Sequence, residues 1–102
     1  MEQLGTNSNT IPWDATDYLK TDDDIAEYLA AAFETGEVDD VTHALATIAR
    51  ARGMSDTAKV AGLSRGTLYK AIGEGANPTL STFLSVLSAM NISLSAKPKA
   101  AA

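Results

Sequence analysis

The stretch Met54–Gly73, MSDTAKVAGLSRGTLYKAIG, is expected to form two short helices separated by a tight turn. The first helix would cover Ser55–Ala61, and Gly62 would supply the left-handed backbone that ends it. Ser64 has the hydroxyl side chain of a helix N-cap, so the second helix would run from there to about Ile72. Two short helices joined by so tight a turn form a helix-turn-helix unit, whose core is residues 54–73.

The apolar residues of this stretch occupy positions that would face inward. Ala58 would lie where the two helices cross, because only a small side chain fits there, and Leu63 would fill the angle between them. Leu68 and Ala71 would face the core. Thr57 stands where a buried aliphatic residue is usual, so its hydroxyl would need a hydrogen-bond partner.

The outward face of the second helix carries side chains suited to nucleic acid. An arginine can bind guanine O6 and N7 with two hydrogen bonds, and a threonine can offer a hydroxyl or a methyl group to a base. Tyrosine and lysine can reach backbone phosphates. The predicted DNA-binding residues are Ser64, Arg65, Gly66, Thr67, Tyr69, Lys70, Lys59 and Arg52.

Charge is unevenly distributed along the 102 residues, whose net charge is -5. Residues 1–49 carry eleven acidic residues and one basic residue, a net charge of -10. Residues 50–102 carry seven basic and two acidic residues, a net charge of +5. This asymmetry indicates two surfaces, one for an anion such as nucleic acid and one for a basic partner. The alternative is that the acidic half is an ordinary solubilising surface.

Three longer amphipathic helices flank the helix-turn-helix unit. The first would be capped by Thr21 and run to about Thr35, the second would cover Asp39–Arg52, and the last would run from the Thr79 cap to Met90. The fold class is therefore all-α, with five helices around one core. The side chains expected to be buried are Ile25, Leu29, Ala32 and Phe33 in the first helix, Val41, Ala44, Leu45, Ile48 and Ala49 in the second, and Leu80, Phe83, Leu84 and Leu87 in the last.

Residues 1–20 are predicted to be a flexible acidic N-terminal segment with a short helical turn. Its aromatic residues Trp13 and Tyr18, together with Tyr28 in the following helix, have two interpretations. They could cover the domain's own core, or they could bind a protein partner. These three residues are the predicted contacts to such a partner.

The helix-turn-helix domain is predicted to cover residues 21–96, followed by a disordered tail at residues 97–102. Near its end, Ile92, Leu94 and Ala96 alternate with serines, which predicts a short C-terminal strand. The apolar residues of this strand could end the core or pair with a second copy across a two-fold axis.

The composition argues against several other functions. There is no cysteine and the only histidine is His43, so we expect no catalytic residues, no metal site and no cofactor, and the protein is not expected to be an enzyme. Asp22–Asp24 fit the acidic first turn of a helix better than a calcium loop. No apolar run is long enough for a membrane span and no signal peptide is recognisable, so a cytoplasmic location is expected.

Three segments resemble a known family: PWDATDYLKTDDDIAEYLAAAFETG (Pro12–Gly36), ATIARARGMSDTAKVAGLSRGTLYKAIG (Ala46–Gly73) and NPTLSTFLSVLSAMNISLSA (Asn77–Ala96). The chain is similar to the addiction module antidote proteins, which are HigA-like antitoxins of the Cro and lambda-repressor helix-turn-helix superfamily. The resemblance implies a lambda-repressor-like domain with an N-terminal acidic helical extension. It also implies an antitoxin of a type II toxin-antitoxin module that binds operator DNA, represses its own operon and neutralises a small basic toxin of the RelE/HigB type.

Two alternatives remain beside this interpretation. The chain could be a stand-alone phage-type transcriptional repressor without a toxin, or a helical protein-interaction domain that does not bind DNA. For either repressor a homodimer is expected, because one short helix reads only a few base pairs and a two-fold dimer binds two half-sites about 34 Å apart.

Overall fold

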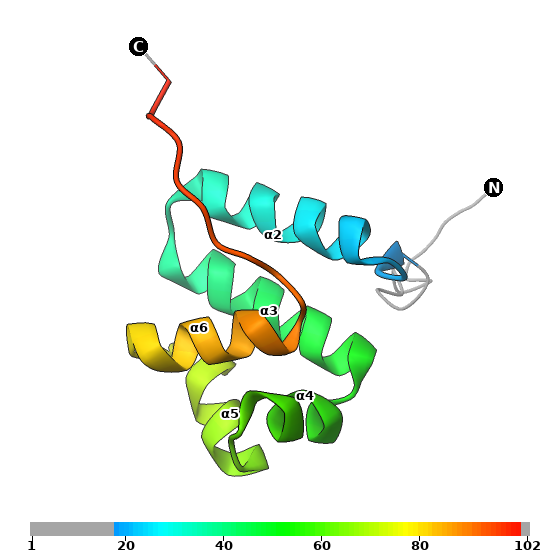
Figure 1. The fold of residues 1–102 in the computed structure, drawn as a ribbon. Coiled ribbons are helices and arrows are strands. Elements are labelled where there is room, and N and C mark those ends of the chain that lie inside the picture. Colours follow the sequence, from blue (N-terminus) through cyan, green and yellow to red (C-terminus); the bar gives the residue numbers. More distant parts are fainter. Residues whose placement is uncertain (1–17, 101–102) are drawn as a thin grey trace, which may run out of the picture.

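The computed structural model describes residues 18–100, and within this range all regular secondary structure is α-helical. Figure 1 shows α2 lying along α3, with α4 and α5 on the opposite side of α3 from α2. Helix α6 contacts α4. The all-α prediction with five helices is therefore confirmed for the described residues. The helices are α2 (Asp22–Thr35), α3 (Val38–Arg52), α4 (Met54–Ala61), α5 (Arg65–Ile72) and α6 (Leu80–Ala89).

Helix α2 begins at the predicted cap. The Thr21 hydroxyl accepts a hydrogen bond from the Asp24 backbone N–H at 3.0 Å, and the Asp24 carboxylate accepts one in return from the Thr21 N–H at 3.1 Å. The Lys20 N–H donates to the same carboxylate at 3.2 Å. These two backbone donors, Thr21 first and Lys20 second, hold the pKa of the Asp24 carboxyl below its ordinary value of 3.8. The carboxylate thus satisfies amides that a helix start leaves unpaired.

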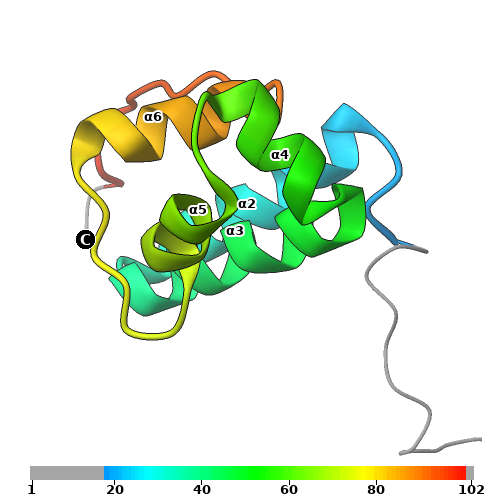
Figure 2. The same cartoon turned by 90° about the horizontal axis from the view of Figure 1, so that it is seen from below.

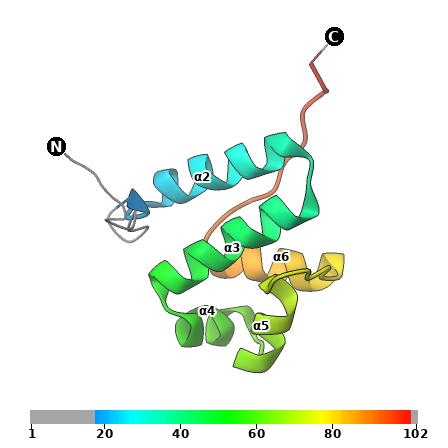
Figure 3. The ribbon, with the colours of Figure 1, turned by 180° about the vertical axis from the view of Figure 1, so that it is seen from behind.

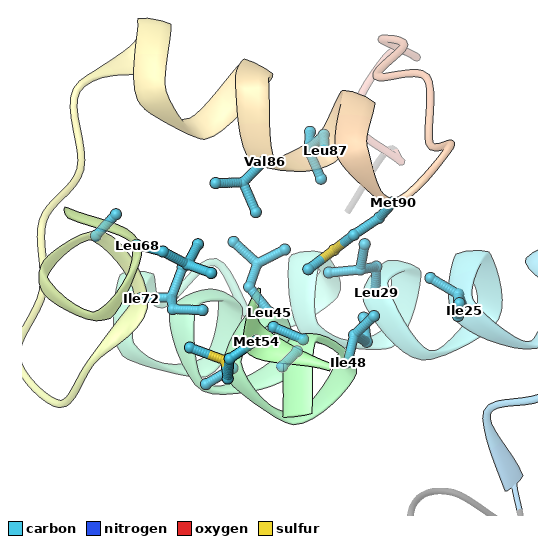
Figure 4. Close-up of a cluster of buried hydrophobic side chains, with 14 of the residues drawn as sticks. Ile25, Leu29, Leu45, Ile48, Met54, Leu68, Ile72, Val86, Leu87 and Met90 are labelled. Atoms are coloured by element: carbon cyan, nitrogen blue, oxygen red, sulfur yellow. The ribbon is translucent and has the colours of Figure 1, made fainter. Parts of the chain in front are cut away.

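The core lies where α2 and α3 meet α4, α5 and α6 (Figure 4). Ile25 and Leu29 of α2 and Leu45 and Ile48 of α3 are buried, as their helical spacing predicts. Leu19 is also buried, at 6% exposure, so the core extends beyond the predicted domain start at residue 21. The predicted stripes of α2 and α3 are therefore confirmed, and their other members pack against or within the same cluster: Ala32, Phe33, Val41, Ala44 and Ala49.

The predicted stripe of α6 is wrong in two of its four members. Leu87 is buried and Phe83 packs against the core, but Leu80 is 66% exposed and Leu84 is 43% exposed. Val86, which the stripe omitted, is fully buried, as is Met90 just beyond the helix. Two apolar stripes overlap on this helix, and the one through residues 83, 86, 87 and 90 faces inward. The other is left at the surface.

The C-terminal residues 92–100 form neither helix nor strand. Figures 1 and 3 show this segment leaving α6 and passing over α2, where only helices are beside it, so the predicted strand has no neighbouring strand within the described residues. Ile92 packs against the core, whereas Leu94 is 48% exposed. Ile92 thus ends the core, and pairing of the segment with a second copy stays a prediction.

Candidate nucleic-acid interface

The turn between α4 and α5 consists of Gly62, Leu63 and the α5 cap. Gly62 has a φ of 74°, in the left-handed region, as its place after α4 predicts. The Leu63 N–H donates to the Ala58 carbonyl at 2.9 Å, and the Gly62 N–H donates to the Lys59 carbonyl at 3.2 Å. This pair of bonds is a Schellman motif, which satisfies carbonyls at the end of α4 and sends the chain sharply toward α5.

Helix α4 begins directly after α3, with Gly53 as the only residue between them. The buried Thr57 hydroxyl donates to the Gly53 carbonyl at 2.9 Å, so the polar group at this usually aliphatic position has a partner. Ala58 is 2% exposed, which agrees with the prediction that a small side chain lies at the crossing of the two short helices. Both positions fix α4 against the core.

Ser64 caps helix α5: its hydroxyl accepts from the Thr67 backbone N–H at 3.0 Å and donates to the Thr67 hydroxyl at 2.9 Å. Leu68 is fully buried and Ala71 is 7% exposed, as predicted. At the other end, a Cβ added to Gly73 would lie 2.6 Å from the Tyr69 carbonyl oxygen, so this position requires glycine for space. These contacts fix how α5 is rotated about its axis.

The outward face of α5 consists of the predicted DNA-binding side chains. Figure 2 views the molecule from the side where α4 and α5 lie. The Arg65 guanidinium donates to the Tyr69 hydroxyl at 3.1 Å, and its central carbon lies 5.6 Å from the centre of the Tyr69 ring. Tyr69 therefore restricts the conformations of Arg65 before any ligand is present. The exposed residues of this face are the cap Ser64 and Arg65, Gly66, Thr67, Tyr69 and Lys70 of α5. Lys59 is also exposed, on the last turn of α4.

Arg52, the eighth predicted DNA-binding residue, lies at the end of α3 and is already paired. Its Nη2 atom is 3.1 Å from Asp22 Oδ1, and the Asn91 amide donates to Asp22 Oδ2 at 2.7 Å. Asp22 thereby joins the start of α2 to the end of α3 and to the residue that follows α6. Sequence separations of 30 and 69 residues hid these contacts from pattern analysis.

The aromatic residues predicted to bind a toxin are only partly described. Trp13 lies outside the described residues. Tyr28 packs against the core, and the Tyr18 ring contacts it edge to face with centres 6.3 Å apart. Tyr18 itself is 42% exposed. Tyr28 therefore contacts the domain's own core, and Tyr18 contacts Tyr28 while staying partly exposed. Toxin binding by these residues stays a prediction.

Sequence reasoning missed an apolar groove where the α2–α3 turn faces the start of α6. Its volume is about 410 Å³. Phe33 and Phe83 contribute rings whose centres are 6.2 Å apart, edge to face, and Val38 and Leu80 are 54% and 66% exposed. The full lining is Phe33, Gly36, Glu37, Val38, Val41, Thr42, Asn77, Pro78, Leu80 and Phe83.

Two further observations concern the described part of the chain. No helix in it is long and apolar enough to cross a membrane. Among residues 18–100, no three histidine or acidic side chains are grouped as a metal site would require. His43 is exposed, as its position off the apolar stripe of α3 predicts.

Comparison with known proteins gives two matches. The model of a family described as "Probable addiction module antidote protein" matches residues 9–98. An "Uncharacterized protein" of Haemophilus influenzae (strain Rd) is 38% identical over 80 residues, which is 78% of this chain and 82% of the relative. No solved structure matches the chain.

Proposed function

Because this chain belongs to the probable addiction module antidote family, we propose that it is the antitoxin of a type II toxin-antitoxin module that also represses its own operon. In this proposal it binds operator DNA through α5 and neutralises a small basic toxin of the RelE/HigB type. The α4–α5 unit would be a helix-turn-helix of the lambda-repressor kind.

The outward face of α5 carries the DNA part of the proposal. The buried residues of α5 hold the helix against the core, so its outward face keeps one orientation. Arg65 lies in the first turn, and the N-terminal residues of a recognition helix are those that contact base edges in the major groove. In this proposal the exposed lysines Lys70 and Lys59 contact backbone phosphates.

A dimer would supply the affinity that one short helix lacks. The outward face of α5 is only two turns long and can read few base pairs. Two copies related by a two-fold axis would place their α5 helices in successive major grooves, about 34 Å apart.

The acidic half of the chain supports the antitoxin part. All charged residues of the described range from Asp22 to Asp40 are acidic, so α2 and the start of α3 would attract a basic protein. We propose that this half binds toxin, with Tyr18 and Trp13 contributing at its N-terminal end.

Fluorescence anisotropy tests the DNA part with two labelled duplexes, one from the region upstream of the gene and one with the same bases scrambled. Binding should be at least about 10³-fold tighter to the upstream duplex at physiological salt, the difference typical of specific recognition. Equal affinity for both duplexes, or no binding at low salt, would instead support a protein-interaction domain that does not read DNA.

A further inference from the structure

We propose that the apolar groove between the α2–α3 turn and the start of α6 is the docking site for the toxin. It would accept an apolar side chain that a basic protein presents between its own cationic residues. This inference rests on the proposed antitoxin function and names the surface that performs it.

The groove has the shape and chemistry of a pocket for an anchoring side chain. Phe33, Val41 and Phe83 are half-buried and pack against the core, so they form a fixed apolar base. Val38 and Leu80 stand more than half exposed beside them. A concave apolar surface with exposed aliphatic residues is typical of a protein contact, since covering it removes that area from water.

The charges around the groove determine which partner fits. Glu37 lines the groove, and Glu34, Asp39 and Asp40 are exposed on the same two helix ends. Lys97 forms an ion pair with Glu34 at 3.6 Å, and both of these side chains are mostly exposed. The rim is therefore net negative, which favours a basic partner.

A second copy of this chain fits the groove less well. A two-fold contact places the same patch of both copies face to face, so Glu37 and its acidic neighbours would oppose one another. Like charges brought together in this way cost binding free energy. A basic toxin meets no such repulsion.

The groove is also separate from the proposed DNA-binding residues. None of its lining residues is among the exposed side chains of α5 or Lys59. Figure 1 shows the α2–α3 turn and the start of α6 at one end of the molecule, with α4 and α5 below. One chain could therefore hold toxin and operator together.

The test is a calorimetric titration of the full chain with the small basic protein encoded by the adjacent reading frame. The variants are Val38→Ser and Leu80→Ser, and the matched control is Val60→Ser, which changes an equally apolar residue that is 69% exposed outside the groove. Each groove variant should weaken binding by about tenfold or more, as loss of an anchor residue does, while the control stays within about twofold. Circular dichroism and operator binding should be unchanged in all three.

A charge variant gives a second measurement. Glu37→Lys should slow association with the basic protein, and the slowing should diminish as salt is raised, because rim charges act mainly on the association rate. An association rate equal to that of the wild type would contradict the assignment of the acidic rim.

The outcomes separate this inference from the function on which it rests. If the wild type does not bind the adjacent basic protein, the antitoxin proposal itself fails. If the wild type binds and the groove variants bind as well as Val60→Ser, the antitoxin proposal stands and the groove assignment is wrong. Sedimentation of the free chain gives the third outcome. If the wild type is a dimer and Val38→Ser or Leu80→Ser is a monomer, the groove joins two copies and the inference is overturned.

Discussion

Helices α5 and α6 begin in the same way and expose opposite chemistry. Ser64 and Thr79 cap them, and each hydroxyl accepts from the backbone N–H three residues on, at 3.0 and 3.2 Å. Beyond its cap α5 exposes polar and basic groups such as Lys70, whereas α6 exposes Leu80 and Leu84. A polar helix face suits phosphates and base edges, and an apolar one suits a protein surface. Two similarly capped helices thus expose surfaces of different chemistry.

The largest expected effect comes from changing the turn that positions α5. Gly62→Val should lower the free energy of unfolding by about 1–3 kcal/mol, because a β-branched residue resists the φ of 74° there. A Cβ would meet nothing within 4 Å, so the cost arises from the backbone alone. Thermal denaturation measures this loss of stability. The variant should also bind operator DNA more weakly, because the strained turn no longer positions α5.

Gly66→Ala is the matched control for that variant. Gly66 lies in the first turn of α5 without a left-handed φ, and a Cβ there would sit 4.0 Å from the Ser64 oxygen, an ordinary contact. Alanine should therefore stabilise the fold by about 0.5–1 kcal/mol through its higher helix propensity. Equal destabilisation by both changes would refute the special role of the left-handed turn.

Arg65→Ala addresses specific recognition by α5. If Arg65 binds a guanine edge, the change should cost about 1–3 kcal/mol of operator binding and relax the preference at one base pair. Tyr69→Phe is the comparison variant, since it keeps the ring and removes the hydroxyl that the guanidinium contacts at 3.1 Å and that could also reach a phosphate. Tyr69→Phe should lose less operator affinity than Arg65→Ala. Competition with a panel of single-base operator variants measures both.

Lys70→Ala should have a smaller and less selective effect. As a phosphate contact on the exposed face of α5, Lys70 should contribute to binding of operator and random DNA alike. Its removal should also reduce the slope of log K against log salt by about one. If Lys70→Ala instead alters base preference as Arg65→Ala does, the roles of the two residues have been assigned wrongly.

The sequence predicted α5 far better than α6, for physical reasons. In α5 only Leu68, Ala71 and Ile72 are available for burial, so its outward face followed directly from the pattern. In α6 the apolar residues occupy two neighbouring stripes, and either could face inward by helical spacing alone. Packing against α2 to α5 selects the stripe that ends in Met90. Capping residues were predicted correctly at Thr21, Ser64 and Thr79 because a cap is a local interaction.

Contacts between residues far apart in the chain could not be predicted from the sequence. The groove forms only when the α2–α3 turn meets the start of α6. Two of its lining residues, Phe33 and Leu80, are more than 40 residues apart in the sequence. The ion pair of Arg52 with Asp22 also joins distant residues. The basic residues near Arg50 led to the prediction that Arg52 binds DNA, and no neighbouring residue indicated an acidic partner. The charge distribution along the sequence predicted an acidic and a basic half. Only the tertiary structure shows which charged side chains form ion pairs with each other.

The smallest expected effect separates Arg52 from Lys59, two basic residues that were both predicted to bind DNA. Arg52 is held by Asp22 at 3.1 Å, and both side chains are partly exposed, so Arg52→Gln should cost only about 0.2–1 kcal/mol of stability, less at high salt. Lys59 has an exposed side chain on the last turn of α4 and forms no ion pair with another described residue, so Lys59→Gln should leave stability unchanged and weaken operator binding. Denaturant unfolding and operator titration on both variants measure the two effects side by side. An equal loss of operator affinity in both variants would show that Arg52 serves the DNA surface in spite of its ion pair, and would extend that surface from α5 to the end of α3.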